Sequence, residues 1–134
     1  MSLFAWSPQY SVGCAEIDQQ HQKLFKMADD LHQAMSERRG RAVITDLLKR
    51  LIDYTVYHFA TEEKRMQESG YPNYPQHRVE HVKLTDRVMA FQKKVVSGET
   101  MISIDVLQFL SDWLKHHIGE SDQKLGTHLR MRPR

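Results

Sequence analysis

The chain has little cysteine, glycine or proline: one cysteine, Cys14, with six glycines and four prolines in 134 residues. One cysteine cannot form an intrachain disulfide, which fits the reducing cytoplasm where we expect the protein to be located. So few glycines and prolines disfavour a turn-rich all-β fold. No apolar run approaches the roughly 20 residues of a membrane-spanning helix. The first residues also lack the basic and apolar regions of an export signal.

The chain also lacks a large excess of charge of one sign. It has 19 lysines and arginines and 17 aspartates and glutamates, which gives a net charge of +2. A nucleic-acid-binding protein needs a concentrated positive field, so we expect no nucleic-acid partner. Hydrophobic residues make up 40% of the chain and charged residues 27%, as in globular proteins. We expect one domain over residues 1–134, acting as a monomer. What the chain does contain is an unusual number of histidines, eight.

Glycine and proline positions divide the chain into four segments with apolar residues at helical spacing. In the third segment, for example, Leu84, Val88, Phe91 and Val95 recur at steps of four and three. Short loops between four amphipathic helices predict an all-α, antiparallel up-and-down four-helix bundle. The predicted parts are an irregular N-terminal arm over 1–17, helices over about 18–38, 41–67, 76–97 and 104–118, and a tail over 123–134.

Polar residues continue the apolar stripe of every predicted helix. They are His21, His58, Glu62, His77, His81 and His117. In an up-and-down bundle the starts of the first and third helices lie beside the ends of the second and fourth, so all six fall in one half of the bundle. Burying a charged group of this kind without a partner costs roughly several kcal/mol. Their convergence from four helices therefore favours a metal site.

A seventh candidate ligand, Asp122, lies five residues after His117. On an ideal helix this spacing separates the two side chains by about 140°. We expect the helix to loosen or bulge near Gly119, so that Asp122 turns back toward the interior.

Five imidazoles and two carboxylates are too many for one tetrahedral zinc ion. They suit two octahedral ions that share carboxylates, with iron favoured over manganese or zinc. No glutamate begins the Glu-x-x-His motif of ferritin-like di-iron proteins. Because the set is rich in histidine and poor in carboxylate, it favours reversible ligand binding over oxidation chemistry.

The order His21, His58-x-x-x-Glu62, His77-x-x-x-His81, His117-x-x-x-x-Asp122 resembles the hemerythrin family, and specifically its single-domain bacterial members. The flanking residues agree with this resemblance, which covers about residues 6–125. They include Ile17-Asp18-Gln19-Gln20, Gly70-Tyr71-Pro72 and Trp113-Leu114.

The resemblance implies a non-haem di-iron centre with an oxo or hydroxo bridge. By this likeness His77, His81 and His117 would hold one iron, His21 and His58 the other, and Glu62 and Asp122 would bridge them. Dioxygen would bind reversibly at the open position of the two-histidine iron. The candidates for an apolar wall around that position are Phe59, Trp113, Leu114 and Ile118.

We therefore expect an oxygen-binding protein rather than an enzyme, used in storage, in sensing or in delivery to an oxygen-consuming enzyme. Two alternatives use the same ligands: a di-iron peroxidase, oxidase or nitric-oxide-handling enzyme, and an iron-buffering protein.

Several other polar residues are expected to have no role as ligands. His32 lies about 16 Å along the helix axis from His21, at about 1.5 Å per residue, so we interpret it as structural. We expect His116 on the surface or behind the ligands and His128 in solvent. Asp18 is predicted to cap the first helix, and Glu63 and Glu80 to lie on solvated faces.

Overall fold

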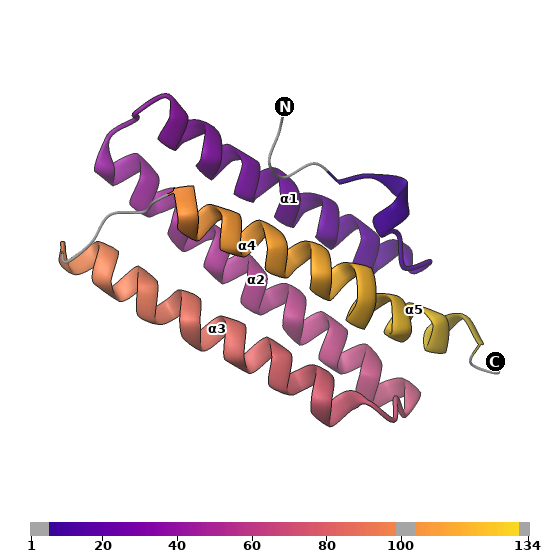
Figure 1. The fold of residues 1–134 in the computed structure, drawn as a ribbon. Coiled ribbons are helices and arrows are strands. Elements are labelled where there is room, and N and C mark those ends of the chain that lie inside the picture. Colours follow the sequence, from indigo (N-terminus) through magenta and orange to yellow (C-terminus); the bar gives the residue numbers. More distant parts are fainter. Residues whose placement is uncertain (1–5, 99–103, 132–134) are drawn as a thin grey trace.

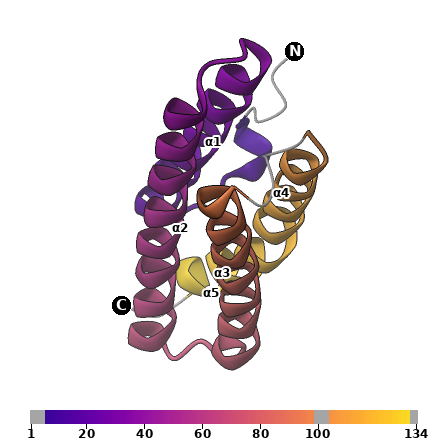
Figure 2. The same ribbon diagram turned by 90° about the vertical axis from the view of Figure 1, so that its left-hand side faces the viewer.

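The computed structural model describes residues 6–98 and 104–131, with side chains for all of these except 104–106. Residues 1–5 of the predicted arm and residues 132–134 of the predicted tail lie outside the described ranges. Within them there is no β-strand. Four long helices run alongside one another in both views of the molecule (Figure 1, Figure 2). They are α1 (Ala15–Ser36), α2 (Arg41–Ser69), α3 (Tyr74–Ser97) and α4 (Ile104–His116).

The prediction of an all-α up-and-down bundle is confirmed. The start of α1, the end of α2, the start of α3 and the end of α4 meet at the right-hand side of Figure 1. Between α2 and α3 the chain turns sharply at Gly70, whose φ of 66° is readily adopted only by glycine. This turn brings the last residues of α2 beside the first residues of α3. No described helix is both long and apolar enough to cross a lipid bilayer.

Helix α1 begins at Ala15, three residues before the predicted start, and Cys14 occupies its N-cap position. The prediction that Asp18 caps the helix was therefore wrong. Asp18 lies in the first turn and accepts hydrogen bonds from the Val12 N–H, at 2.8 Å, and from the Ser11 hydroxyl. A carboxylate in the first turn is favoured by the helix dipole, and here it also fastens the N-terminal arm. That arm contains a short 3-10 helix, η1 (Pro8–Tyr10).

The C-terminal segment differs most from the prediction, because most of the expected tail is helical. Helix α4 passes through a π-helical turn, η2 (His117–Ser121), into helix α5 (Asp122–Met131). The prediction overlooked that Leu125 and Leu129 lie four residues apart, on one face of a helix. Leu125 is fully buried in a small apolar cluster with Val12 and Ile17, so α5 holds the arm against the end of the bundle.

Candidate metal centre

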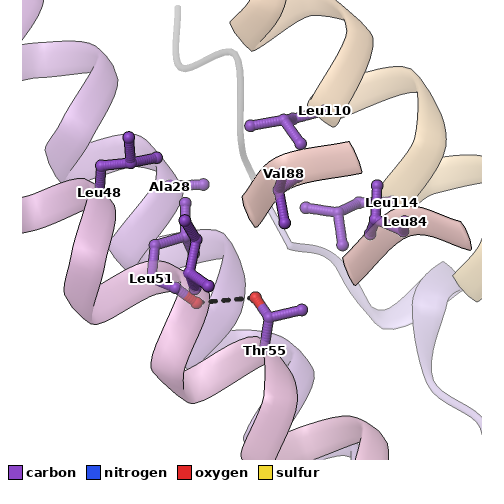
Figure 3. A pocket seen from close by; sticks show the side chains of 9 residues that line it. Ala28, Leu48, Leu51, Thr55, Leu84, Val88, Leu110 and Leu114 are labelled. Carbon is purple, nitrogen blue, oxygen red and sulfur yellow. Dashed lines mark hydrogen bonds between the residues drawn. The ribbon is translucent and has the colours of Figure 1, made fainter. Parts of the chain in front are cut away.

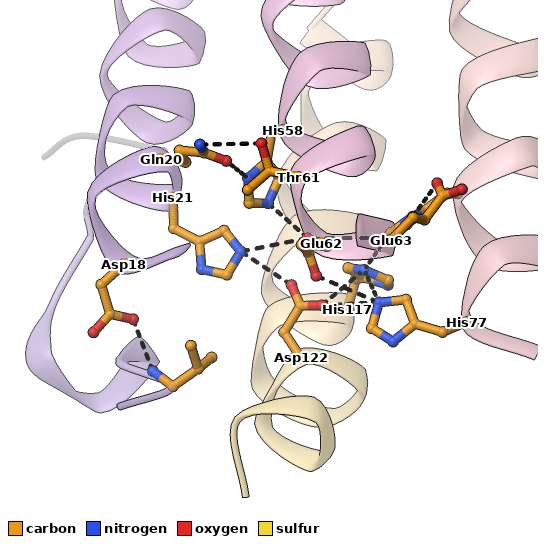
Figure 4. A network of polar contacts seen from close by, with 12 residues as sticks. Asp18, Gln20, His21, His58, Thr61, Glu62, Glu63, His77, His117 and Asp122 are labelled. Atoms are coloured by element: carbon orange, nitrogen blue, oxygen red, sulfur yellow. Dashed lines mark hydrogen bonds and ion pairs between the residues drawn. The ribbon is translucent and has the colours of Figure 1, made fainter. Parts of the chain in front are cut away.

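All seven candidate ligands lie together at one end of the bundle, where α1, α2, α3, η2 and the start of α5 meet (Figure 4). None of them is more than 3% exposed. Their positions follow from the helix register: i, i+4 spacing places His58 above Glu62 on α2 and His77 above His81 on α3. Asp122 reaches the same space because η2 bulges, as expected near Gly119.

The potential ligand atoms form two groups, and within each group they lie within 4.8 Å of one another. One group holds His77, His81 and His117, and the other holds His21 and His58. Glu62 and Asp122 belong to both groups. The grouping is the one that the hemerythrin resemblance implies, and the residues' role as metal ligands stays a prediction.

The two carboxylates lie between the groups with one oxygen toward each. Asp122 Oδ1 is 2.9 Å from His77 Nε2, while its Oδ2 is 3.0 Å from His21 Nε2. Glu62 Oε1 is 2.7 Å from His58 Nε2, and its Oε2 is 3.5 Å from His77 Nε2. Two carboxylates in this position can each hold two cations at once.

In the three-histidine group, the Nε2 atom of His117 lies 3.1 Å from that of His77 and 3.2 Å from that of His81. These distances match a metal's coordination shell, since neighbouring ligands of an octahedral ion with bonds of about 2.1 Å lie about 3.0 Å apart. Three imidazole nitrogens directed at one point cannot all satisfy one another by hydrogen bonding, because each neutral ring offers one N–H and one lone pair. A cation between them would.

Several buried atoms at the centre have no well-directed hydrogen bond within the described part of the chain, although some of them lie within 3.0 Å of a neighbouring nitrogen or oxygen. They are both ring nitrogens of His21, Nδ1 of His117, both oxygens of Glu62 and both oxygens of Asp122. Buried polar atoms are nearly always hydrogen-bonded, and exceptions call for an explanation. Most of these orphaned atoms face the centre of the cluster, so a pair of metal ions fits the donor set and would satisfy them.

Two of the candidate ligand histidines are oriented from behind by side chains that sequence reasoning missed. Gln20 Oε1 accepts a hydrogen bond from His58 Nδ1 at 2.7 Å, and Glu63 Oε2 accepts one from His81 Nδ1 at 3.0 Å. Both bonds place the proton on Nδ1 and leave the Nε2 lone pair free to bind a metal. The only sequence feature that could have indicated them is that each lies next to a candidate ligand, because Gln20 precedes His21 and Glu63 follows Glu62.

The prediction that Glu63 and Glu80 lie on solvated faces was therefore wrong for Glu63, whose side chain is 24% exposed, while the side chain of Glu80 is 41% exposed and lies at the edge of the cluster. Glu80 Oε1 is 3.7 Å from His117 Nδ1 and accepts a hydrogen bond from the Ser121 hydroxyl at 2.9 Å. The helical periodicity places both carboxylates outside the buried face of their helices. A side chain at the edge of that face can still reach a buried imidazole from the side opposite the cluster.

Aromatic rings cover the three-histidine group. Phe59 stacks on His81, with ring centroids 3.8 Å apart and planes inclined by 4°. Trp113 stacks on His117 at 4.4 Å and 13°. Ile118 is buried in the main core cluster. Of the four residues expected in an apolar wall, these three cover the centre or pack beside it, while the fourth, Leu114, lines a cavity.

That cavity lies in the bundle core, among side chains of α1, α2, α3 and α4 (Figure 3). Its volume is about 30 Å³, enough for one small molecule, since a water needs roughly 10–15 Å³. Thr55, Leu84 and Leu114 line it, and each lies three residues from a candidate ligand on its own helix. The other lining residues are Ala28, Leu48, Leu51, Ile52, Val88 and Leu110. Thr55, the polar member, donates its hydroxyl to the Leu51 carbonyl at 2.7 Å.

In the absence of a metal ion, protons compensate the two buried carboxylates. Burial alone would lower the pKa of each histidine, but Asp122 and Glu62 outweigh burial and raise the pKa of His21 and His77 to about 9. Asp122 likewise raises the pKa of His117 to about 10 against the effect of burial. Burial dominates at His81 and lowers its pKa to about 3, so this ring is neutral. The two buried carboxylates thus need positive charge beside them, which protonated histidines supply when no metal ion does.

The remaining histidines lie outside the cluster. His32 is half-buried on α1, and His116 is exposed, with Nε2 3.4 Å from Glu120 Oε2. The expectation that His128 lies in solvent was wrong. It is half-buried on α5, donates to the Ser69 carbonyl at 3.0 Å and packs against Tyr71. It therefore helps to fasten α5 to the end of α2.

Comparison with known proteins agrees with this geometry. Residues 12–129 match the family model described as the hemerythrin HHE cation binding domain. The chain is 35% identical to a bacteriohemerythrin of Methylococcus capsulatus over 94% of its own length and 96% of the relative. It is 36% identical to a bacteriohemerythrin of Stenotrophomonas maltophilia, over 92% of this chain and 79% of that one.

A crystal structure of wild-type hemerythrin superposes with a TM-score of 0.91 at 35% identity, covering 96% of this chain and 98% of that chain. A match of this extent, together with relatives above 30% identity along most of the sequence, leaves the fold and the ancestry in no doubt. The chain belongs to the hemerythrin family.

Proposed function

We propose that the protein holds two iron ions in this centre and binds dioxygen reversibly there. The observation that carries the proposal is the position of Glu62 and Asp122, each with one oxygen toward the three-histidine group and the other toward the two-histidine group. Imidazole with carboxylate is a ligand set that suits iron. The family's cation-binding description and the bacteriohemerythrin names of its relatives support the same choice.

In this proposal His77, His81 and His117 hold one ion, His21 and His58 hold the other, and Glu62 and Asp122 bridge them. The ion with two histidines has fewer protein ligands and can accept a small molecule. When bound, the iron pair would supply the reversible electron transfer that dioxygen binding requires. The chain's own part is to fix the histidine tautomers and to keep water away from the site.

The apolar cavity beside the centre favours a carrier over a catalyst. Cleavage of dioxygen or of a peroxide consumes protons, so an enzyme of that class needs a proton donor near the bound gas. Thr55 supplies the only hydroxyl among the residues that line the cavity, and this hydroxyl is already donated to the Leu51 carbonyl. The surroundings therefore suit an uncharged diatomic molecule that is released chemically unchanged.

Metal analysis followed by an anaerobic oxygen titration tests the proposal. We expect two irons per chain, and a visible charge-transfer band that forms in the reduced protein with air and disappears under vacuum. A single zinc ion would refute the di-iron centre. A band that decays with steady consumption of an added reductant would favour the enzyme alternative, and ready exchange of iron with a chelator would favour iron buffering.

We further propose that the protein works as a cytoplasmic monomer that stores dioxygen or delivers it to an oxygen-consuming enzyme. The lone, half-buried Cys14 and the small net charge of +2 support this proposal. Light scattering at micromolar concentration tests the monomer, and a mass of twice 15.8 kDa would contradict it.

A further inference from the structure

The two histidine groups differ in what stands behind their rings. In the two-histidine group, His58 Nδ1 donates to the neutral amide oxygen of Gln20. The amide cannot present its nitrogen instead, because Gln20 Nε2 donates to Thr61 Oγ1 at 3.3 Å. His21 Nδ1 is buried without a hydrogen bond to any described residue. Among the described residues, no carboxylate is hydrogen-bonded behind either ring of this group.

In the three-histidine group, the rings of His81 and His117 have carboxylates behind them. His81 Nδ1 donates to Glu63 Oε2 at 3.0 Å, and the second oxygen of Glu63 lies 3.5 Å from Arg78 Nε. Arg78 and the imidazole thus hold the carboxylate from two sides. Glu80 Oε1 lies 3.7 Å from His117 Nδ1, too far for a hydrogen bond but close enough for electrostatic attraction.

A carboxylate behind an imidazole makes it a stronger ligand than an amide does. The negative acceptor draws the Nδ1 proton toward itself, so electron density rises at Nε2, where the metal binds. Removing such an outer partner weakens metal binding by about 10- to 100-fold. The stacked ring of Phe59 fixes the plane of His81, so the Glu63 bond acts on a ring that is already aimed at the centre.

We propose that Glu63 is a positioning residue that makes the three-histidine subsite the tighter of the two, while the neutral partner Gln20 keeps the two-histidine subsite weaker. The first ion therefore enters the three-histidine subsite. The second ion is held by rings that have no carboxylate hydrogen-bonded behind them and remains the more electrophilic, which suits the position proposed for the exogenous ligand. This inference rests on the proposed two-ion centre.

Titration of the metal-free protein with Co²⁺, followed by calorimetry and by the visible spectrum, tests the order of filling. We expect two resolved steps with the first at least about tenfold tighter than the second. Glu63→Gln keeps the shape and the hydrogen-bond acceptor but removes the charge, so it should weaken the first step about tenfold or more and leave the second nearly unchanged. Gln20→Glu should tighten the second step.

Glu68→Gln serves as the matched control, because it removes the same charge from an exposed position on the same helix. It should change neither step. The melting temperature of each metal-free variant separates a positioning role from a merely structural one, since Glu63→Gln should melt close to the parent protein while its first Co²⁺ step shifts.

Two ions that bind with equal affinity, or a Glu63→Gln variant that weakens only the second step or both steps equally, would overturn this inference and leave the two-ion centre intact. Binding of fewer than two Co²⁺ ions by the parent protein would overturn the proposed function itself. Unchanged steps in Glu63→Gln would also overturn the inference.

Discussion

His117 and Asp122 lie five residues apart, yet His117 Nε2 is 3.2 Å from Asp122 Oδ1. The backbone explains this contact, because the Asp122 N–H bonds to the His117 carbonyl in an i→i+5 pattern. A regular α-helix would turn the two side chains about 140° apart. The π-helical turn takes up one extra residue and returns Asp122 to the face that carries His117.

Deleting Gly119 should therefore be tolerated, because it converts the π-helical turn into a regular α-helical one in which the aspartate follows His117 by four residues. Residues i and i+4 share a helix face, so both side chains keep their direction. We expect a folded protein with two bound metal ions and a melting temperature within a few degrees of the parent protein. Circular dichroism and metal analysis check this.

Deletion of Lys115 is the matched comparison, because it removes one residue from the regular part of the same helix. It rotates His117 and everything after it by about 100° relative to α4. We expect this variant to lose bound metal and much of its stability. If both deletions behave alike, the bulge does not position Asp122.

Replacing Glu62 by alanine should lower the number of bound metal ions from two to one or fewer. Glu62 is fully buried and shared by both ligand groups, so no other side chain can take its place. His32→Ala changes a half-buried residue on α1 outside the cluster and should retain two ions. Equal losses in the two variants, measured by metal analysis, would show that the site has been misplaced.

The metal-free protein should lose stability as the pH rises above neutrality. The pKa values of His21 and His77, about 9, lie above the ordinary value of 6.5. Protonation therefore stabilises the metal-free fold fully below pH 6.5, and this contribution is lost as the pH rises through about 9. His117, with a pKa of about 10, keeps its proton longest, and above that pH Glu62 and Asp122 remain charged in the core without compensation.

Thermal melts check this prediction. Between pH 7 and pH 10 the metal-free protein should lose at least about 3 °C, which corresponds to about 1 kcal/mol for a chain of this size. The metal-loaded protein should show no such loss, because the ions replace the protons, and metal binding should tighten with rising pH. A metal-free protein whose melting temperature rises over this range would contradict the proposed charge balance.

Much of the fold and of the centre could be predicted because one signal determines both. Apolar residues that repeat at helical spacing define the buried face of each helix, and His58, Glu62, His77 and His81 lie on the same repeat. Asp122 needed a departure from that repeat, and its spacing from His117 together with Gly119 indicated where. The side chains then had to converge, because four helices meet at that end.

What the sequence did not reveal lies at the edges of the helical faces. Gln20 and Glu63 are off the core stripe, and only the distance between neighbouring helices decides whether they reach a buried ring or extend into solvent. Helix α5 was missed for a similar reason, since two leucines in a short basic segment carry little periodic signal. Its stability depends on docking against the N-terminal arm, which is a contact between the two ends of the sequence.

The same docking yields a prediction about two glycines of the C-terminal segment. Gly126 lies against the backbone of Val12, and a methyl group there would overlap the Val12 carbonyl oxygen. A methyl group on Gly119, by contrast, would point into open space. Gly126→Ala should therefore destabilise the protein by about 1–3 kcal/mol, the usual cost of overpacking, and should loosen the arm. Gly119→Ala should be neutral or slightly stabilising, as alanine favours helix over glycine.

Chemical denaturation measures both effects, and proteolysis of the arm shows whether the loss is local. Apart from Asp122, the first residue of α5, the candidate ligands lie on other elements, so Gly126→Ala should keep its two metal ions while the arm becomes sensitive to protease. If alanine is tolerated at position 126, the arm and α5 are not packed together in solution. If it also abolishes metal binding, the docked arm is needed to hold His21 and Asp122 in place.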